Sequence, residues 1–166
     1  MESTKMRSGS MTSKVIIDFL IDIPMFDKLE PDELGLVTSH MNFIDLDPGE
    51  ILFREGEPGD YVCFIAEGSL DVMKESKEEG RYVTLATLSK GRSIGEMAII
   101  DDFPRSATVK GHSRATLVIL TRKGFDLILE KHPRIGVRIL KGLSRLLSQN
   151  MRKTSSRLAD YMLPLS

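Results

Sequence analysis

The stretch 93–109, SIGEMAIIDDFPRSATV, contains residues that can together bind a phosphorylated sugar; we call it the cassette. Four helix-compatible residues follow Gly95 and Glu96 and end before an Asp-Asp-Phe-Pro segment, which predicts one helical turn, Met97–Ile100, between two strands. The first turn of a helix offers free backbone N–H groups and a partial positive charge, which favour a phosphate. Arg105 can add a bidentate contact, and the Ser106 hydroxyl a further hydrogen bond.

Glu96 has a different role in this interpretation. An ionised carboxylate only accepts hydrogen bonds, so we expect Glu96 to accept one from a sugar hydroxyl rather than to approach a phosphate. The alternative is that Glu96 and Arg105 form a structural ion pair across a loop, the commoner arrangement for such residues. The sequence outside the cassette is needed to choose between ligand binding and a structural ion pair.

Composition limits the protein class. The chain has 166 residues, of which 41% are hydrophobic and 28% charged, as in a globular domain with one core. Its formal net charge of −1 argues against a protein that coats nucleic acid. The single cysteine, Cys63, lies in an apolar run, so we expect a buried thiol and a reducing compartment, the cytoplasm.

The N-terminal region predicts neither a membrane anchor nor a signal peptide. The most apolar segment, 15–26, is too short to span a bilayer and contains two aspartates and a proline. Residues 1–12 are mostly polar and lack the apolar core of a secretion signal. We expect 1–12 to be disordered.

Short strands dominate the middle of the chain. Runs rich in β-branched and aromatic residues alternate with turns that contain glycine, proline or aspartate; they are 43–46, 51–54, 61–66, 70–74, 82–88, 107–112 and 116–120. Seven or eight such strands predict a sandwich, barrel or jelly roll. Short helices are expected before them, around 15–20 and 31–37, and another at 123–131 after them.

A longer helix is predicted from Pro133 to about Met162. Its apolar residues share one face; they are Leu140, Leu143, Leu147, Met151, Leu158 and Met162. Basic residues lie near the opposite face: Arg134, Arg138, Lys141, Arg145 and Arg152. The apolar face suits either a dimer interface or packing back over the binding site. We interpret the basic face as solvated, with an acidic partner or nucleic acid as the less favoured alternative.

The sequence does not indicate catalysis or a metal site. His40, His112 and His132 have no partner at metal-ligand spacing, and the Asp45-Leu46-Asp47 segment lacks the glycine and ligands of a calcium loop. No Walker loop, dinucleotide glycine motif, nucleophile elbow or HExxH motif occurs. We therefore expect a protein that is not an enzyme and needs no cofactor.

The cassette and the order of elements resemble the cyclic-nucleotide-binding domain family, which includes catabolite activator-type regulators, kinase regulatory subunits and gated channels. The resemblance covers roughly residues 23–162. It is most specific over Gly95–Ala98 and Pro104–Ala107, and it extends to the turn glycines Gly49, Gly56 and Gly68. It implies an eight-stranded antiparallel jelly roll with N-terminal helices and a long C-terminal helix.

The resemblance also implies the ligand contacts. Glu96 would bind the ribose 2′-hydroxyl, and Arg105, Ser106 and Ala107 would hold the cyclic phosphate, with Gly95, Met97 and Ala98 around it as the other matching residues of the family's motif. The order Arg-Ser-Ala favours cAMP over cGMP. The tail 152–160 resembles the end of the bacterial dimer helix, which makes Thr154 and Ser155 candidate base contacts.

We divide the chain into a disordered start at 1–12, a cyclic-nucleotide-binding jelly roll at 13–132 and a C-terminal helix for dimerisation and ligand capping at 133–166. The bacterial activators continue into a helix-turn-helix domain, for which too few residues follow here, so we expect no DNA binding by this chain. The predicted function is a cAMP sensor, a homodimer through its C-terminal helix, that acts on a protein partner. The alternatives are an interaction module of the same fold that no longer uses a nucleotide, and a fragment of a longer transcription regulator.

Overall fold

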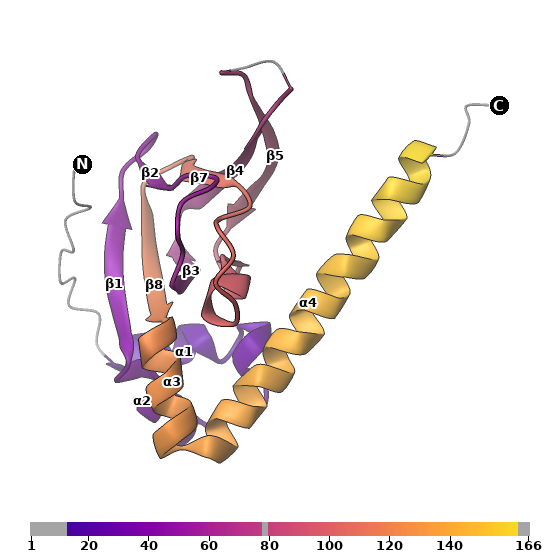
Figure 1. Cartoon of the computed structure of the whole chain (residues 1–166). Coiled ribbons are helices and arrows are strands. Elements are labelled where there is room, and N and C mark those ends of the chain that lie inside the picture. Colours follow the sequence, from indigo (N-terminus) through magenta and orange to yellow (C-terminus); the bar gives the residue numbers. More distant parts are fainter. Residues whose placement is uncertain (1–12, 78–79, 163–166) are drawn as a thin grey trace.

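The computed structural model describes residues 13–77 and 80–162; the predicted disordered start at 1–12 lies outside them. Within these residues, eight strands form two four-stranded antiparallel sheets (Figure 1). The first sheet has the order β1 (Met41–Leu46), β8 (Ala115–Thr121), β3 (Tyr61–Glu67) and β6 (Ser93–Ile94). The second has the order β2 (Ile51–Phe53), β7 (Thr108–Gly111), β4 (Ser69–Glu75) and β5 (Tyr82–Ser89). This architecture confirms the predicted eight-stranded jelly roll.

Helices pack on the outer face of the first sheet. Before the strands are α1 (Ser13–Leu20), the 3₁₀ turn η1 (Pro24–Phe26) and α2 (Pro31–Thr38); after them follow α3 (Arg122–Lys131) and α4 (Pro133–Met162). The 3₁₀ turn η2 (Glu96–Ile99) lies inside the cassette. Pro31 is the first residue of α2, where a reciprocal pair of hydrogen bonds between Glu30 and Glu33 caps the helix.

Two hydrophobic cores lie on the two sides of the first sheet. Cys63 and Ile65 of β3 face the second sheet, whereas Val62 and Phe64 face the helices, because successive side chains of a strand point to opposite faces. The side chains of β8 also point alternately into the two cores, and the strand is buried along most of its length. This double burial explains why the sequences of β3 and β8 are continuous apolar runs instead of alternating ones.

The predicted boundaries differ from the observed ones mainly at the cassette. β6 is only two residues long and is not among the predicted strands, because its residues have no distinctive pattern of their own. It pairs with β3, with Ile94 opposite Cys63. The strand expected at 107–112 is shorter, Thr108–Gly111, which leaves Ser106 and Ala107 in a loop.

The long helix α4 has two distinct halves. Its first half is packed: Ile135, Ile139 and Leu143 are buried, and a Cβ on Gly142 would lie 2.3 Å from the Met25 carbonyl oxygen. Every described residue from Met151 to Met162 is exposed, and Figure 1 shows this half projecting away from the strands. The predicted apolar face is therefore buried at Leu143, half-buried at Leu140 and Leu147, and exposed at Met151, Leu158 and Met162.

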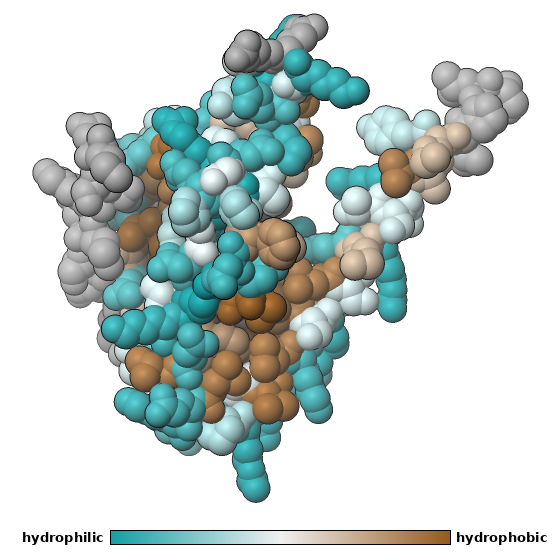
Figure 2. All heavy atoms as spheres, in the orientation of Figure 1, coloured by the Kyte–Doolittle hydropathy of each residue, from teal (hydrophilic) through white to brown (hydrophobic). Residues whose placement is uncertain are grey.

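Two ion pairs attach the basic face of α4 to the N-terminal region, one to Glu33 in α2 and one to Asp27 just after η1. Arg138 donates to the Glu33 carboxylate at 2.6 and 2.8 Å, and Arg145 donates to Asp27 at 2.7 Å. The basic face is thus partly neutralised. In the space-filling view, hydrophobic side chains gather where the near half of α4 meets the body, and others occur along its projecting half (Figure 2). Within the described ranges, no helix has both the length and the apolar character needed to cross a membrane.

Candidate functional site

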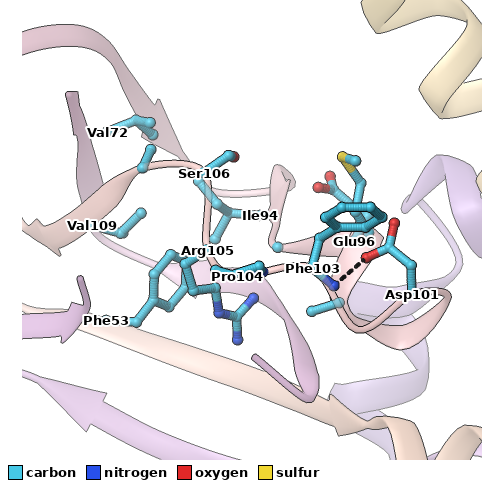
Figure 3. A pocket seen from close by; sticks show the side chains of 14 residues that line it. Phe53, Val72, Ile94, Glu96, Asp101, Phe103, Pro104, Arg105, Ser106 and Val109 are labelled. Carbon is cyan, nitrogen blue, oxygen red and sulfur yellow. Dashed lines mark hydrogen bonds between the residues drawn. The ribbon is translucent and has the colours of Figure 1, made fainter. Parts of the chain in front are cut away.

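The cassette forms one wall of a pocket on the second sheet's side of the molecule (Figure 3). Gly95 precedes η2 with φ of 81°, a left-handed conformation that glycine adopts readily, and so allows the chain to leave β6 and begin the turn at once. The predicted helical turn is therefore present, one residue earlier than Met97–Ile100 and in 3₁₀ form. The loop after η2 returns through Pro104 to β7.

The structure brings most of the predicted site residues together. The pocket lining contains all the predicted cassette residues: Gly95, Glu96, Met97, Ala98, Arg105, Ser106 and Ala107. Other strands add Phe53, Val72, Ile94 and Val109. Thr154 and Ser155 do not line this pocket; both are exposed on the projecting half of α4.

The size of the hollow limits what it can enclose. Its volume is about 190 Å³, below the roughly 300–1,000 Å³ of pockets that enclose a whole drug-sized ligand. Its rim carries exposed apolar side chains, Met97 at 54% and Phe103 at 74% exposure. A ligand the size of a nucleotide would therefore fit in part, with the remainder lying against the rim.

Arg105 is the principal charged group of the site. Its side chain is 5% exposed, and the guanidinium carbon lies 4.0 Å from the ring centre of Phe53 and 4.5 Å from that of Tyr61. Nη2 donates to the Tyr61 carbonyl oxygen at 2.9 Å. Nε and Nη1 are buried without an acceptor among the described residues. A buried cation with unsatisfied donors is costly, so this arrangement favours an anion at Arg105.

Two glycines make room for this guanidinium. A Cβ on Gly59 would lie 2.4 Å from Arg105 Nε, and a Cβ on Gly95 would lie 2.4 Å from Nη1. The backbone of Arg105 is fixed as well, because its N–H donates to the Glu57 carbonyl at 2.8 Å and its carbonyl accepts from Gly56 N–H at 2.8 Å. The turn between β2 and β3 therefore holds Arg105 in place.

Glu96 is held separately from Arg105. Its carboxylate accepts a hydrogen bond from the Ser93 hydroxyl at 2.7 Å. Within 13–77 and 80–162, no ion pair joins Glu96 to Arg105, so the structural ion pair considered from the sequence is not what the two residues form. The Glu96 side chain also lines the pocket. Its ionised carboxylate can therefore accept a hydrogen bond from a hydroxyl group there.

Ser106 and Ala107 follow Arg105 at the pocket edge. The Ser106 carbonyl accepts from Lys74 Nζ at 2.9 Å, and Lys74 also pairs with Glu55 at 3.0 Å. The hydrogen bond from Lys74 is the main cause of the lowered pKa of Glu55. Among the described residues, the backbone N–H groups of Ser106 and Ala107 have no acceptor. They are thus donors available at the pocket beside the unsatisfied nitrogens of Arg105.

Cys63 and Tyr61, beneath the site, should make the fold sensitive to alkaline pH. Burial raises the pKa of the Cys63 thiol from 9.0 to about 12, and that of Tyr61 from 10.0 to about 12. The unfolded chain therefore releases these protons at lower pH than the folded one, and stability is expected to fall as pH rises above about 9. Urea denaturation with reductant between about pH 8 and 10 measures this, and Cys63→Ala should show a smaller decline. An equal decline in this variant would contradict the assignment to Cys63.

Several residues of the site carry no sign of their role in the sequence. Phe53 and Tyr61 stack on Arg105, and Gly59 makes room for it, yet all three lie far from the cassette in the chain. Arg122, the first residue of α3, donates to the cassette backbone and was also missed. The only available signal was the glycine-rich segment before β3, because a close approach of another chain segment often requires glycine.

Comparison with known proteins identifies the family of the chain. A model of the cyclic nucleotide-binding domain matches residues 43–132, more than half of the chain. The chain is 30% identical over 67% of its length to a cAMP-dependent protein kinase regulatory subunit of Emericella nidulans, and 26% identical over 83% to a CRP-like cAMP-activated global transcriptional regulator of Mycobacterium tuberculosis. It spans only 26% and 59% of these two relatives.

A solved structure extends the comparison to most of the chain. A cyclic nucleotide-binding domain from Methylobacillus flagellatus superposes with a TM-score of 0.80 at 28% identity, covering 91% of this chain and 84% of that one. The fold, the pocket and the buried arginine had already pointed to a domain that binds a small anionic ligand. With the family model and this structural match, they establish that the chain belongs to the cyclic nucleotide-binding domain family.

Proposed function

We propose that this chain is a cAMP-binding sensor, not an enzyme, in which ligand binding at the cassette moves α4. The observation that carries the proposal is the buried guanidinium of Arg105, whose Nε and Nη1 have no acceptor among the described residues. A cyclic phosphate would supply the missing charge and acceptors. The N–H groups of Ser106 and Ala107 and the turn that begins with Gly95 would complete its surroundings.

Glu96 is proposed to bind the ribose 2′-hydroxyl. Its carboxylate lines the same pocket as Arg105 but does not pair with it, and Ser93 fixes its orientation. The sugar and the phosphate are thus assigned to separate groups. Gly95, Met97 and Ala98 shape the hollow between these groups.

cAMP is favoured over cGMP for two reasons. The cassette has Ser106 and Ala107 after the arginine, an order that resembles cAMP-binding bacterial activators, and the kinase subunit and the transcriptional regulator to which the chain is similar carry cAMP in their names. The base would lie outside the small hollow, against the rim near Met97 and Phe103. Thr154 and Ser155 are proposed to contact it after α4 has moved towards the pocket.

Isothermal titration of the purified chain tests this proposal. We expect cAMP to bind more tightly than cGMP, and 2′-deoxy-cAMP to bind at least tenfold more weakly than cAMP because Glu96 loses its donor. Absence of heat with high-micromolar cAMP and cGMP would contradict the proposed function. It would favour an interaction module of the same fold that does not use a nucleotide.

A homodimer through the projecting half of α4 is the second part of the proposal. Met151, Leu158 and Met162 are exposed on the face that the sequence marks as apolar. We expect Leu158→Glu to weaken dimerisation at least tenfold, because it places a charge in an apolar interface. Gln149→Glu is the control, since Gln149 is exposed on the opposite side of the helix. Sedimentation equilibrium measures both variants, and an unchanged dimer in Leu158→Glu would contradict the proposal.

The moving helix is proposed to act on a protein partner in the cytoplasm. A net charge of −1 and the neutralisation of Arg138 and Arg145 by carboxylates give little support to DNA binding by this chain. A ligand shifts the position of α4 only by its difference in affinity for the two arrangements. A physical connection between cassette and helix is therefore required.

A further inference from the structure

Arg122 connects the cassette to the C-terminal helices. Its Nε donates to the Ala98 carbonyl at 2.9 Å, and its Nη2 donates to the same carbonyl at 2.6 Å and to the Gly59 carbonyl at 3.1 Å. The guanidinium also donates to the Asp101 carbonyl and to the Asp102 carboxylate. One side chain thus joins the turn before β3, the cassette and α3.

The position of Arg122 is set by the start of α3. The Thr121 hydroxyl accepts from Gly124 N–H at 3.0 Å and so caps the helix, which makes Arg122 its first residue. The side chain is 27% exposed, so its contacts are partly shielded from water. A lysine could not replace it fully, because only guanidinium has a planar fork that reaches several carbonyls at once.

Two of the three backbone carbonyls that Arg122 binds lie at the end of η2 or just after it. The last carbonyls of a helical turn have no partner within the turn, and a cation there satisfies them. Ala98 lies in the last part of η2, and Asp101 lies two residues after its end. Gly59, the third backbone acceptor, is one of the two glycines that make room for the Arg105 guanidinium. Arg122 therefore fixes both the turn that would face a ligand and the segment against which Arg105 lies.

The helix that carries Arg122 is packed tightly against α4. Phe125 and Ile128 of α3 share one hydrophobic core with Ile135 and Ile139 of α4. A Cβ on Gly136 would lie 2.5 Å from a methyl carbon of Leu129, so the two helices approach closely where the chain turns. A displacement of α3 would therefore displace the near half of α4 with it.

We propose that Arg122 is a positioning residue that fixes the cassette for ligand binding and transmits its displacement to α3 and α4. This inference rests on the proposed function, since it assigns the connection which that function requires. The connection consists of the hydrogen bonds that Arg122 donates to the cassette backbone, at the C-terminal side of η2 and away from Gly95. Capping of the base by Thr154 and Ser155 is then a consequence of the movement and not its cause.

Affinity measurements test the positioning role. We expect Arg122→Gln to weaken cAMP binding at least tenfold and Arg122→Lys at least threefold, although Arg122 itself is not placed in contact with the ligand. Lys123→Gln, which removes an exposed charge from the same helical turn, should have no effect.

A distance measurement tests transmission. Spin labels at Asn42→Cys in β1 and Gln149→Cys in α4 sit at exposed positions, while Cys63 is buried and should remain unlabelled. In the otherwise unmutated protein, saturating cAMP should shift the distance distribution between the labels. In Arg122→Gln at saturating cAMP, this shift should be lost. If Arg122 only stabilised the fold, the same shift would remain in the variant.

The outcomes separate this inference from the proposed function. Failure of the unmutated protein to bind cAMP contradicts the proposed function. If the unmutated protein binds cAMP, then an unchanged affinity or an unchanged distance shift in Arg122→Gln overturns the role of Arg122. Circular dichroism reports whether Arg122→Gln is folded. If it is not, Arg122→Lys is used in both measurements. An unchanged affinity or an unchanged distance shift in that variant would then overturn the role of Arg122.

Discussion

Replacing Arg105 by alanine is expected to weaken cAMP binding about a hundredfold. The substitution removes a charge-assisted contact from a sheltered site, a loss of roughly 3 kcal/mol. The fold should survive, because the ligand-free guanidinium is itself buried with unsatisfied Nε and Nη1, and its loss removes that cost. Isothermal titration measures the affinity, and thermal unfolding without ligand measures the fold.

Two further variants define the origin of this effect. Arg105→Lys should lose nearly as much affinity as Arg105→Ala, because a lysine cannot make a bidentate contact and stacks less well on Phe53 and Tyr61. Arg114→Ala removes an exposed arginine and should leave the affinity unchanged. If Arg105→Ala bound cAMP within threefold of the unmutated protein, the phosphate would have to lie elsewhere.

Gly68→Ala is expected to destabilise the fold by about 3–5 kcal/mol, the largest stability effect we predict. Gly68 lies between β3 and β4 with φ of 79°, where an alanine is strained. Its Cβ would also lie 2.0 Å from the Arg114 carbonyl oxygen and 2.7 Å from the Ala115 Cα. Both are backbone atoms of the turn into β8, so neither yields without moving the sheet.

Gly49 and Gly91 provide matched controls for this prediction. They have φ of 79° and 85°, but a Cβ on either would meet nothing within 4 Å. Alanine at these positions should therefore cost only the backbone strain, about 1–2 kcal/mol. Urea denaturation compares the three variants. Equal losses at all three positions would mean that the contact with Arg114 contributes nothing.

The fold was predictable because its signals are local. Short β-branched runs and turn glycines marked most strands, and Pro31 and Pro133 marked helix starts that the structure confirms. β6 was missed because two residues carry no periodicity. The sequence also did not show where α4 leaves the rest of the protein. An amphipathic pattern identifies the apolar face of a helix, but not how far along the helix that face is packed.

The candidate site was likewise predictable from the sequence only in part. Glu96 and Arg105 lie within one stretch, so their spacing in the sequence was informative by itself. The partners of Arg105 were not apparent, because Tyr61 is 44 residues away and meets it only when β3 passes beneath the cassette. Arg122 is 24 residues from Ala98, and a single arginine at a helix start has no signature that distinguishes it from a surface charge. Contacts that depend on sheet topology are invisible to local pattern.

The projecting half of α4 has a mechanical consequence. Residues 151–162, all of them exposed, extend for about 18 Å at a rise of about 1.5 Å per residue. A tilt of about 10° where the helix leaves the body would therefore carry the tip through about 3 Å. Because this half lies free of the body, that sweep meets little resistance. If ligand binding moves α4 as proposed, the packed half of the helix is the short arm of a lever and the exposed half, 151–162, is its long arm.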